Sequence, residues 1–543
     1  MDPVLKVSVV VPVHNAGSYI DKCAQSLLGQ SIGRDAYEVV YVDDGSTDDS
    51  AERLDRLAAR HPHVRVHRQE NSGWPGKPRN VGVRLSRGEY VQFVDQDDEL
   101  GHEALERLYD LGRRNGSDIV LGKPAGTMAR PSNVFARTVD RCTVGDHPLF
   151  ESLTPHKMFR RAFLLDHGVR FPEGRCRLED QVFMAHAYAV ARCVSVLGDY
   201  PCYYWMRRED GGNTSSRRLV VDEYFGWLRK VVQTVKAHTP PGPVQDAMLR
   251  RTYRVEILRC VSEPYVLSGH GQVQERFEAV RRLVLEEFPP SVREGFAAVT
   301  RLRARLLEEG RLDCLSLLAR RIRQVRPLAE LGRPRWHDGA LIAPVRMHLA
   351  HEDGRAVTLL ERGGRLVLDP ALTEGIAGAG EWAVGDHLTA AYGEIRLSHR
   401  GQHVGWFPAS DLTVRLENGR GGRRRPVVAG TMRIDPLTAA GGGPLDRGVH
   451  DVSAYFQVLG VGRSVALRGD MRSRPLGGQA VRLGTPSRAV IPYWTAGCQL
   501  ALDVGEFYHR LDAVPRRAGL RELIRVPAHV RVPFAKALHR VRR

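Results

Sequence analysis

The sequence predicts an α/β domain with a mostly parallel sheet, followed by a helical region and then a β-rich region. Up to about residue 220, short runs of apolar β-formers alternate with amphipathic segments, which is the pattern of a doubly wound sheet. From about 220 to 331, apolar residues recur every three or four positions, as in helices. Beyond Trp336, short alternating strands are separated by turn residues, as in a β-sandwich.

Four strands and the helices between them account for the first region. They are expected at Val7–Val13, Ser18–Leu28, Glu38–Val42, Ser50–Arg60, Val64–His67, from Asn80 onward and at Tyr90–Val94. The strands are apolar throughout, as strands buried on both faces are. Polar loops follow them, at the sheet edge where α/β proteins bind ligands. Because GxGxxG and P-loop motifs are absent, a dinucleotide fold and a P-loop are not supported.

The fourth strand ends in an acidic stretch. Asp95, Asp97 and Asp98 follow Tyr90–Val94 directly. Carboxylates this close repel one another, so a nearby cation stabilises them. Oxygen ligands in this number suit Mg²⁺ or Mn²⁺, which proteins usually hold with a few carboxylates and the phosphates of a substrate. The stretch therefore indicates a metal–diphosphate site. The alternative is an acidic turn before the helix Glu103–Arg114, and it would be preferred for an isolated DxDD.

The other polar loops each allow two interpretations. Pro12 fixes the backbone where a flat base could pack, or it simply ends the first strand. Asp44 could accept a hydrogen bond from the imide N–H of uracil, or it could form a turn and a helix N-cap. The loop 71–80 is rich in glycine and proline and carries Lys77 and Arg79. These features suit close approach to a phosphate and equally a solvated surface loop.

Four motifs in this order resemble inverting glycosyltransferases of family 2 with the GT-A fold: VVVPVHN, VDDGSTDD, NSGWPGKPRN and FVDQDDEL. The third is similar to a narrower group, which adds N-acetylglucosamine to the polyribitol phosphate of wall teichoic acid. Trp74 departs from the small residue of that group. The resemblance implies a metal ligand at Asp97. It also implies a UDP-sugar site formed by Pro12, Asp44, Asn71, Lys77, Arg79, Asp95 and Gln96.

The resemblance extends to the acceptor side of the reaction. The pair Glu179-Asp180 matches the family's ED pair, so Asp180 is expected to be the catalytic base that takes the proton of the acceptor hydroxyl. The pair could also cap the helix Gln181–Ala191, and both roles are compatible. A cation for the diphosphate is implied at Arg208, and a polar donor contact at Asn213. The family has a histidine near Asn213, so the ligand set differs here.

Four parts are expected along the chain. They are a catalytic domain over 1–220, a helical linker over 221–332, an immunoglobulin-like β-sandwich over 333–505 and a basic amphipathic tail over 506–543. The resemblance gives the sandwich a role in acceptor binding or in oligomerisation, and in the second case the protein would be a homo-oligomer. The tail alternates apolar and basic residues, which is typical of a peripheral membrane contact and equally of a disordered end.

Composition narrows the partners. The formal charge of +17 fits an anionic polymer or surface. No nucleic-acid partner is expected, because a recognition motif is lacking. Eight scattered cysteines without CxxC argue against a zinc site or a disulfide framework and fit a reducing compartment. Neither a membrane span nor a signal peptide is recognisable. A cytoplasmic location is expected, with peripheral placement at the inner face of the membrane as a variant.

Together these observations predict an inverting glycosyltransferase that requires Mn²⁺ or Mg²⁺. It would move a sugar, N-acetylglucosamine in the first place, from a UDP-sugar to a hydroxyl of an anionic cell-envelope polymer such as a poly(polyol phosphate) teichoic acid. One alternative is a capsule or exopolysaccharide glycosyltransferase that uses another UDP-hexose. Another is a catalytically silent protein that binds anionic polymers. The retention of Asp44, Asp97 and Asp180 argues against the silent protein.

Overall fold

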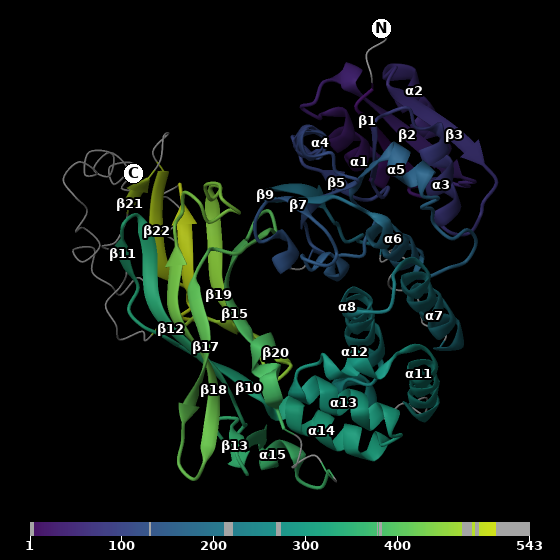
Figure 1. Cartoon of the computed structure of the whole chain (residues 1–543). Helices are drawn as coiled ribbons and strands as arrows, with labels where there is room; N and C mark the ends of the chain where they lie inside the picture. The colour runs from purple at the N-terminus through teal and green to yellow at the C-terminus, as the bar shows by residue number, and fades with distance from the viewer. Residues whose placement is uncertain are drawn as a thin grey trace. The chain divides into compact units, whose positions relative to one another are not determined.

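A computed structural model describes residues 5–129, 132–210, 221–267, 273–376, 378, 383–469, 481–483 and 488–505 of the 543-residue chain. The chain divides into two compact units. Many of the helices and strands are labelled in Figure 1. The first unit contains the described residues up to Gln324 together with those in 362–388 and 459–461, and the second contains the others. Asn213 and the expected tail 506–543 lie outside the described residues.

The first unit is built on a nine-stranded sheet with the order β3-β2-β1-β4-β8-β6-β9-β5 and with β7 paired to β9. Its strands are β1 Val7–Val13, β2 Tyr37–Asp44, β3 Val64–Gln69, β4 Tyr90–Phe93, β5 Glu99–Leu100, β6 Ile119–Ala125, β7 Val139–Cys142, β8 Met158–Arg160 and β9 Val194–Tyr204. The neighbours from β3 to β4 are parallel. In contrast, β8 is antiparallel to both β4 and β6.

The sheet is therefore more mixed than the expected doubly wound sheet. Parallel neighbours need a long crossover, usually a helix. Strands β7 and β8, which the short turn η3 (Leu149–Glu151) separates, are not neighbours in the sheet. Both run opposite to β4, β6 and β9.

Helices α1 to α6 are interleaved with these strands. Their bounds, with those of the 3₁₀ turns, are α1 Tyr19–Leu28, η1 Arg34–Ala36, α2 Ser50–Arg60, α3 Gly76–Leu85, α4 Ala104–Asn115, η2 Asn133–Phe135, α5 Arg161–Asp166 and α6 Glu179–Val190. All seven residues of β1 are buried, so this strand lies at the centre of the core. A Cβ on Gly82 of α3 would lie 2.2 Å from Val10 Cγ1, so α3 packs directly against β1.

Two element boundaries differ from the expectation, and both concern candidate site residues. Strand β2 extends to Asp44, so this carboxylate is the last residue of a strand rather than part of a loop. Helix α3 begins at Gly76 rather than Asn80, which puts Lys77 and Arg79 in its first turn. A proline is tolerated in a first helical turn because the N–H that it lacks has no intrahelical partner there. Pro78 therefore does not delay the start of α3.

The expected helical region follows. It consists of α7 Val221–His238, α8 Pro243–Thr252, the π-helical turn η5 Tyr253–Ile257, α9 Leu258–Cys260, α10 Glu263–Val266, α11 Val273–Glu287, α12 Pro290–Glu294, α13 Ala298–Glu308 and α14 Leu312–Gln324. The apolar spacing over Val244–Leu267 predicts a single helix, and this prediction is wrong, because η5 and the break before α10 interrupt it. Pro264 is tolerated in the first turn of α10 but would break the interior of a longer helix.

The remaining elements are mostly strands. They are β10 Arg326–Leu331, β11 Arg335–His337, β12 Ala340–Ala350, β13 Leu359–Arg362, β14 Arg365–Leu368, α15 Pro370–Thr373, η7 Gly385–Ala390, β15 Tyr392–His399, β16 Gly405–Trp406, β17 Asp411–Asn418, β18 Arg423–Ile434, β19 Gly448–Val458, β20 Val461–Ala466, β21 Val481–Leu483, β22 Arg488–Trp494 and β23 Leu500–Val504. In the second unit, one sheet holds β10, β12 and β18 in that order, with β11 on β12 and β17 on β18. The other sheet follows the order β16-β15-β19-β23-β22-β21.

All eight cysteines are free thiols. Six of them are buried, whereas Cys260 and Cys498 are half-buried. Among the described helices, none combines the length and the apolar composition that crossing a membrane would require.

Candidate active site

Asp44 is held by the loop that follows β3. Its carboxylate is buried and accepts hydrogen bonds from the backbone N–H of Ser72 (3.1 Å), from Ser72 Oγ (2.8 Å) and from Gln69 Nε2 (2.6 Å). Gly45 allows this close approach, because a Cβ there would lie 2.7 Å from the backbone nitrogen of Asn71. Its φ of +69° also favours glycine. The orientation of Asp44 is therefore fixed by neighbouring side chains and backbone.

Three of the expected donor-binding residues lie close to the end of β1. The backbone N–H of His14 donates to Gln96 Oε1 (2.8 Å), and Gln96 Nε2 donates to the His14 carbonyl (3.2 Å). Asn71 Nδ2 lies 3.0 Å from His14 Nδ1. Pro12 is buried within β1, where it pairs with Val42. The ends of β1, β3 and β4 thus meet at His14, a contact residue that the sequence prediction did not include.

Arg79 lies at the centre of a buried ionic network. One of its terminal nitrogens lies 2.8 Å from Asp180 Oδ1 and 3.4 Å from Glu179 Oε1, and the other lies 2.8 Å from Asp95 Oδ1. The Arg79 side chain is 4% exposed and stacks over Phe171 at 5.1 Å. Arg79 therefore joins the end of β4 to the first turn of α6. Both of its terminal nitrogens are engaged with carboxylates, and its expected donor contact stays a prediction.

The carboxylates around Arg79 have shifted pKa values. Burial raises the pKa of Asp180, although the Arg79 guanidinium opposes this effect. Burial and the charge of Asp180 raise the pKa of Glu179 to about 8. For Asp95, burial is outweighed by Arg79 and His156, which hold its pKa well below the usual range. Glu179 and Asp180 also lie in the first turn of α6, where the helix dipole stabilises negative charge.

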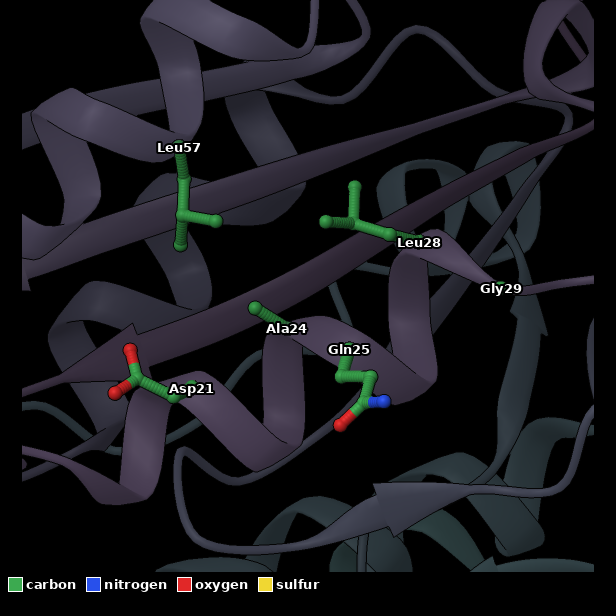
Figure 2. A pocket seen from close by; sticks show the side chains of 6 residues that line it. All are labelled: Asp21, Ala24, Gln25, Leu28, Gly29 and Leu57. Carbon is green, nitrogen blue, oxygen red and sulfur yellow. The ribbon is translucent and has the colours of Figure 1, made fainter.

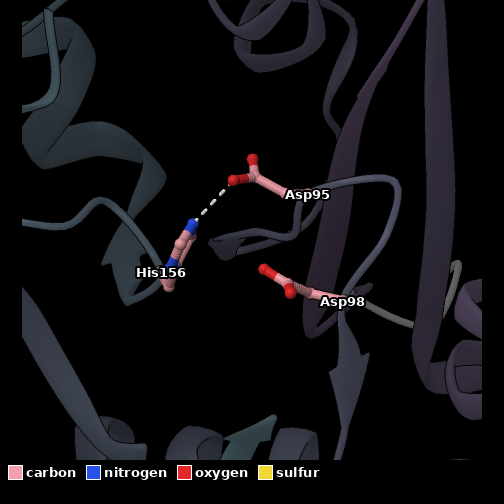
Figure 3. Close-up of side chains that lie close together, drawn as sticks. All are labelled: Asp95, Asp98 and His156. Atoms are coloured by element: carbon pink, nitrogen blue, oxygen red, sulfur yellow. Dashed lines mark hydrogen bonds and ion pairs between the residues drawn. The ribbon is translucent and has the colours of Figure 1, made fainter. Parts of the chain in front are cut away.

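A second group of polar side chains meets beside Asp95. Figure 3 shows Asp95, Asp98 and His156, whose ligand atoms all lie within 4.8 Å of one another. His156 Nε2 lies 3.0 Å from Asp95 Oδ2, and its ring stacks on Tyr203 at 4.2 Å. Two carboxylates and an imidazole are a donor set that can hold a divalent cation. The sequence prediction did not include His156, because it lies 61 positions from Asp95 and has no local metal-ligand spacing to either aspartate.

Both carboxylate oxygens of Asp98 are engaged by hydrogen-bond donors. Its carboxylate accepts hydrogen bonds from the Tyr203 hydroxyl (2.6 Å) and from the backbone N–H of Met206 (2.8 Å). Burial, partly offset by His156, raises the pKa of Asp98 to about 7. The same Tyr203 hydroxyl accepts the backbone N–H of Asp95 at 3.1 Å. Asp98 therefore anchors the acidic turn to β9.

Asp97, the expected metal ligand, lies outside that group of three. It is half-buried, and burial together with the charge of Asp95 raises its pKa to about 6. The Arg208 guanidinium opposes this rise. A half-buried carboxylate with a raised pKa beside another acid is stabilised by a cation, so Asp97 and Asp95 fit a divalent metal.

Arg208 and Lys77 complete the described candidates. Arg208 is 12% exposed, stacks over the Tyr19 ring at 4.4 Å and pairs with Asp210 at 2.7 Å. Its charge acts on Asp97, which fits a cation at the diphosphate end of a donor site. Lys77 is half-buried in the first turn of α3.

A separate hollow of about 420 Å³ lies between α1 and α2 (Figure 2). Its lining is mostly apolar and consists of Asp21, Ala24, Gln25, Leu28, Gly29 and Leu57. A diphosphate needs cations or N–H donors, and this lining supplies no cationic side chain. The hollow is therefore a poor candidate for a nucleotide site.

Known proteins resemble this chain over the α/β domain and the helical region. The family model "Glycosyl transferase family 2" matches residues 8–180. Glycosyltransferase GlyG of Streptococcus pneumoniae is 30% identical over 244 residues, which cover 42% of this chain and 77% of that protein. The chain belongs to glycosyl transferase family 2. The resemblance that the four motifs indicate is thereby confirmed.

Other relatives of this family 2 protein are named as poly(ribitol-phosphate) transferases. The poly(ribitol-phosphate) beta-glucosyltransferase of Bacillus spizizenii is 37% identical over 43% of this chain and 37% of that protein. TarS of Staphylococcus aureus, a poly(ribitol-phosphate) beta-N-acetylglucosaminyltransferase, is 35% identical over 42% of this chain and 40% of that protein. The chain thus matches about two fifths of the length of these relatives.

Matches beyond the first domain concern TarS. The model "Glycosyl transferase TarS linker domain" matches residues 221–319 of this family 2 protein. The crystal structure of S. aureus TarS 1–349 in complex with UDP-GlcNAc superposes with a TM-score of 0.55 at 25% identity and covers 68% of this chain and 97% of that chain. A longer TarS structure covers 92% of this chain with a TM-score of 0.52 at 19% identity, and so indicates a shared fold alone.

Proposed function

We propose that this family 2 protein transfers N-acetylglucosamine from UDP-N-acetylglucosamine to a hydroxyl of an anionic cell-envelope polymer, such as a poly(polyol phosphate) teichoic acid. The observation that carries the proposal is the network around Arg79. It joins the carboxylates at the end of β4, which suit a metal and a diphosphate, to Asp180, which suits a catalytic base. The names of the poly(ribitol-phosphate) relatives support the acceptor class.

In this proposal, the uridine and the sugar are held by Pro12, Asp44, Asn71 and Arg79. Gln96 also contacts the donor, and Lys77 contacts a phosphate of the donor or of the acceptor. Asp97 is the main protein ligand of Mn²⁺ or Mg²⁺, and Asp95 lies beside it. When bound, the metal acts as a Lewis acid that offsets negative charge on the departing diphosphate. Arg208 adds a second positive charge there. Asn213, which lies outside the described residues, keeps its expected donor contact as part of the proposal.

Asp180 acts on the opposite side of the sugar. Its Oδ1 is held by Arg79, so we assign proton transfer from the acceptor hydroxyl to Oδ2. An inverting transferase needs such a base on the face opposite the leaving group. The helix dipole of α6 and Arg79 both favour the ionised form that can accept the proton, which counteracts the effect of burial.

The remaining parts are proposed with the boundaries expected from the sequence. Residues 1–220 form the catalytic domain, 221–332 the linker, 333–505 an immunoglobulin-like domain for acceptor binding or oligomerisation, and 506–543 a basic tail that contacts the membrane surface. This arrangement would place the protein in the cytoplasm at the inner face of the membrane. The charge of +17 supports an anionic polymer or surface as the partner.

A second donor, UDP-glucose, is supported by the B. spizizenii relative, which is named as a beta-glucosyltransferase. The experiment that separates these donors measures UDP release with each UDP-sugar in the presence of Mn²⁺ or Mg²⁺. Polyribitol phosphate, polyglycerol phosphate and a neutral glycan serve as acceptors. The proposal expects turnover of UDP-N-acetylglucosamine with a polyol phosphate and none with the neutral glycan.

Two variants and a chelator control that assay. Asp180→Asn should lower the rate by about 10²–10⁴-fold, the range for loss of a catalytic base. Asp166→Asn, an exposed carboxylate at the end of α5, should leave it unchanged. EDTA should stop turnover. Turnover with the neutral glycan alone would disprove the polymer acceptor, and full activity of Asp180→Asn would disprove the assigned base.

A further inference from the structure

A π-helical turn stands out in the helical region. It spans Tyr253–Ile257 between α8 and α9. Such turns are rare and often occur at functional sites, because an added residue changes the directions of the side chains. Tyr253 anchors this one: it is fully buried, packs against Phe288 and Phe296 at 5.0 and 5.3 Å, and donates to Glu308 at 3.1 Å. Tyr253 therefore fixes the turn against the neighbouring helical elements.

Glu256 in this turn gathers contacts from three other helices. Its side chain is buried and accepts hydrogen bonds from Gln181 Nε2 of α6 (3.0 Å), Tyr224 Oη of α7 (2.6 Å) and Arg251 Nη1 of α8 (3.1 Å). A buried carboxylate is costly unless it is paired and hydrogen-bonded, and Glu256 meets both conditions. The cluster thus joins the matched linker region to the helix that carries Asp180.

Gln181 gives this cluster a link to the proposed chemistry. It follows Asp180 directly in the first turn of α6. Arg79 holds the Asp180 carboxylate itself, whereas Glu256 holds the neighbouring side chain of the same turn. The two contact residues belong to different parts of the chain, since Arg79 lies in the α/β domain and Glu256 in the helical region. Together they can fix the first turn of α6 in one position.

We infer that Glu256 is a positioning residue for Asp180. The inference rests on the proposed function, because it presumes that Asp180 takes the acceptor proton. A reacting group displaced by about 1 Å can lose about 10²-fold in rate, so loss of one of two anchors should have a measurable effect. In this view the linker region helps to set the geometry of the catalytic base, in addition to connecting the domains.

The test compares steady-state kinetics of the full-length protein. Glu256→Ala and Gln181→Ala should each lower kcat by about ten-fold, whereas KM for UDP-N-acetylglucosamine stays within about two-fold. The double variant should lose no more than either single variant, because both remove the same contact. Glu278→Ala serves as a control, since it removes an exposed carboxylate of the same region. Tyr224→Phe removes a single hydroxyl and provides a milder variant, expected at about three-fold, should Glu256→Ala fail to fold.

A further comparison separates positioning from general weakening of the fold. In an Asp180→Asn background, Glu256→Ala should cause no additional loss of the residual rate, because the group that it positions is already inactive. An undiminished ten-fold loss in that background would overturn the inference, and so would wild-type kcat in Glu256→Ala. Absence of turnover in the wild type would instead overturn the proposed function, so the two failures are distinguishable.

Discussion

Removal of the Arg79 charge should change how the stability of the first unit depends on pH. Arg79 is the shared counter-ion of Asp95, Glu179 and Asp180. Loss of one partner of a buried ion pair costs about 3–5 kcal/mol. Because Asp95 and Asp180 are about one third exposed, we expect the Arg79→Gln variant to lose roughly 3 kcal/mol of unfolding free energy at pH 8, at the lower end of that range.

The direction of the pH effect follows from proton binding. Without the Arg79 charge, the folded-state pKa of Asp95 should rise from below to above its unfolded value near 4, and the pKa values of Glu179 and Asp180, which are already raised, should rise further. The folded variant then binds more protons than the unfolded chain above about pH 4, and its stability falls as pH rises through the raised pKa values. One pKa unit corresponds to about 1.4 kcal/mol. The difference from wild type should therefore widen by roughly 2 kcal/mol between pH 5 and pH 8.

Urea unfolding at pH 5, 6, 7 and 8 measures this difference. The control is Arg113→Gln, because the Arg113 side chain is 68% exposed and lies 3.7 Å from Glu89. An exposed pair of this kind should change the unfolding free energy by less than about 1 kcal/mol at every pH. A cost of Arg79→Gln that is the same at all four pH values would refute the role of Arg79 as a shared counter-ion.

Three further outcomes are expected. Asp97→Asn should abolish Mn²⁺-dependent UDP binding in calorimetry while the thermal midpoint stays within a few degrees of wild type, and retained metal-dependent binding would exclude Asp97 as the ligand. Glu38→Gln should cost about 2–3 kcal/mol in urea unfolding at pH 7, because buried Glu38 loses its ion pairs with Arg65 and Arg87. Despite burial, those partners lower the folded pKa of Glu38. The stabilisation is therefore present above the unfolded pKa near 4.3 and should disappear as pH falls through the folded pKa. A difference in unfolding free energy between Glu38→Gln and wild type that persists at pH 2 would contradict this explanation. Gly82→Ala should lower the unfolding free energy by about 1–3 kcal/mol, because the added methyl group clashes with Val10. In α7, the methyl group of Gly226→Ala meets no atom within 4 Å, so this variant should gain about 0.5–1 kcal/mol. Equal thermal midpoints of the two variants would contradict both expectations.

Local sequence signals predicted the framework of the site. The apolar runs of β1, β2 and β4 are strong because each strand is buried along its whole length, and their polar ends identified Asp44 and the acidic turn. The boundaries of helices were harder to predict from the sequence. The start of helix α3 at Gly76 is compatible with Pro78, because Pro78 falls within the first turn, where a proline is tolerated.

Long-range contacts could not be predicted in the same way. Arg79 lies 101 positions from Asp180, and His156 lies 61 positions from Asp95. The spacing of apolar residues does not predict such a pairing, because it depends on where β8 joins the sheet and on how α6 packs against the sheet. The π-helical turn at Tyr253–Ile257 was hidden as well, since an apolar pattern spaced by three and four residues does not reveal one inserted residue. The sequence therefore indicated which residues are reactive more clearly than it indicated their partners.

The state of the cysteines has a practical consequence for spectroscopy. Thiol reagents react with the thiolate, and burial raises the pKa of the Cys142 thiol to about 12 and that of the half-buried Cys260 to about 11. Six of the eight thiols are also shielded by burial. A cysteine introduced at an exposed position such as Lys22 on α1 should react much faster than these shielded thiols. The natural chain therefore offers a low-background scaffold for attaching fluorophores or spin labels, without prior removal of its shielded cysteines.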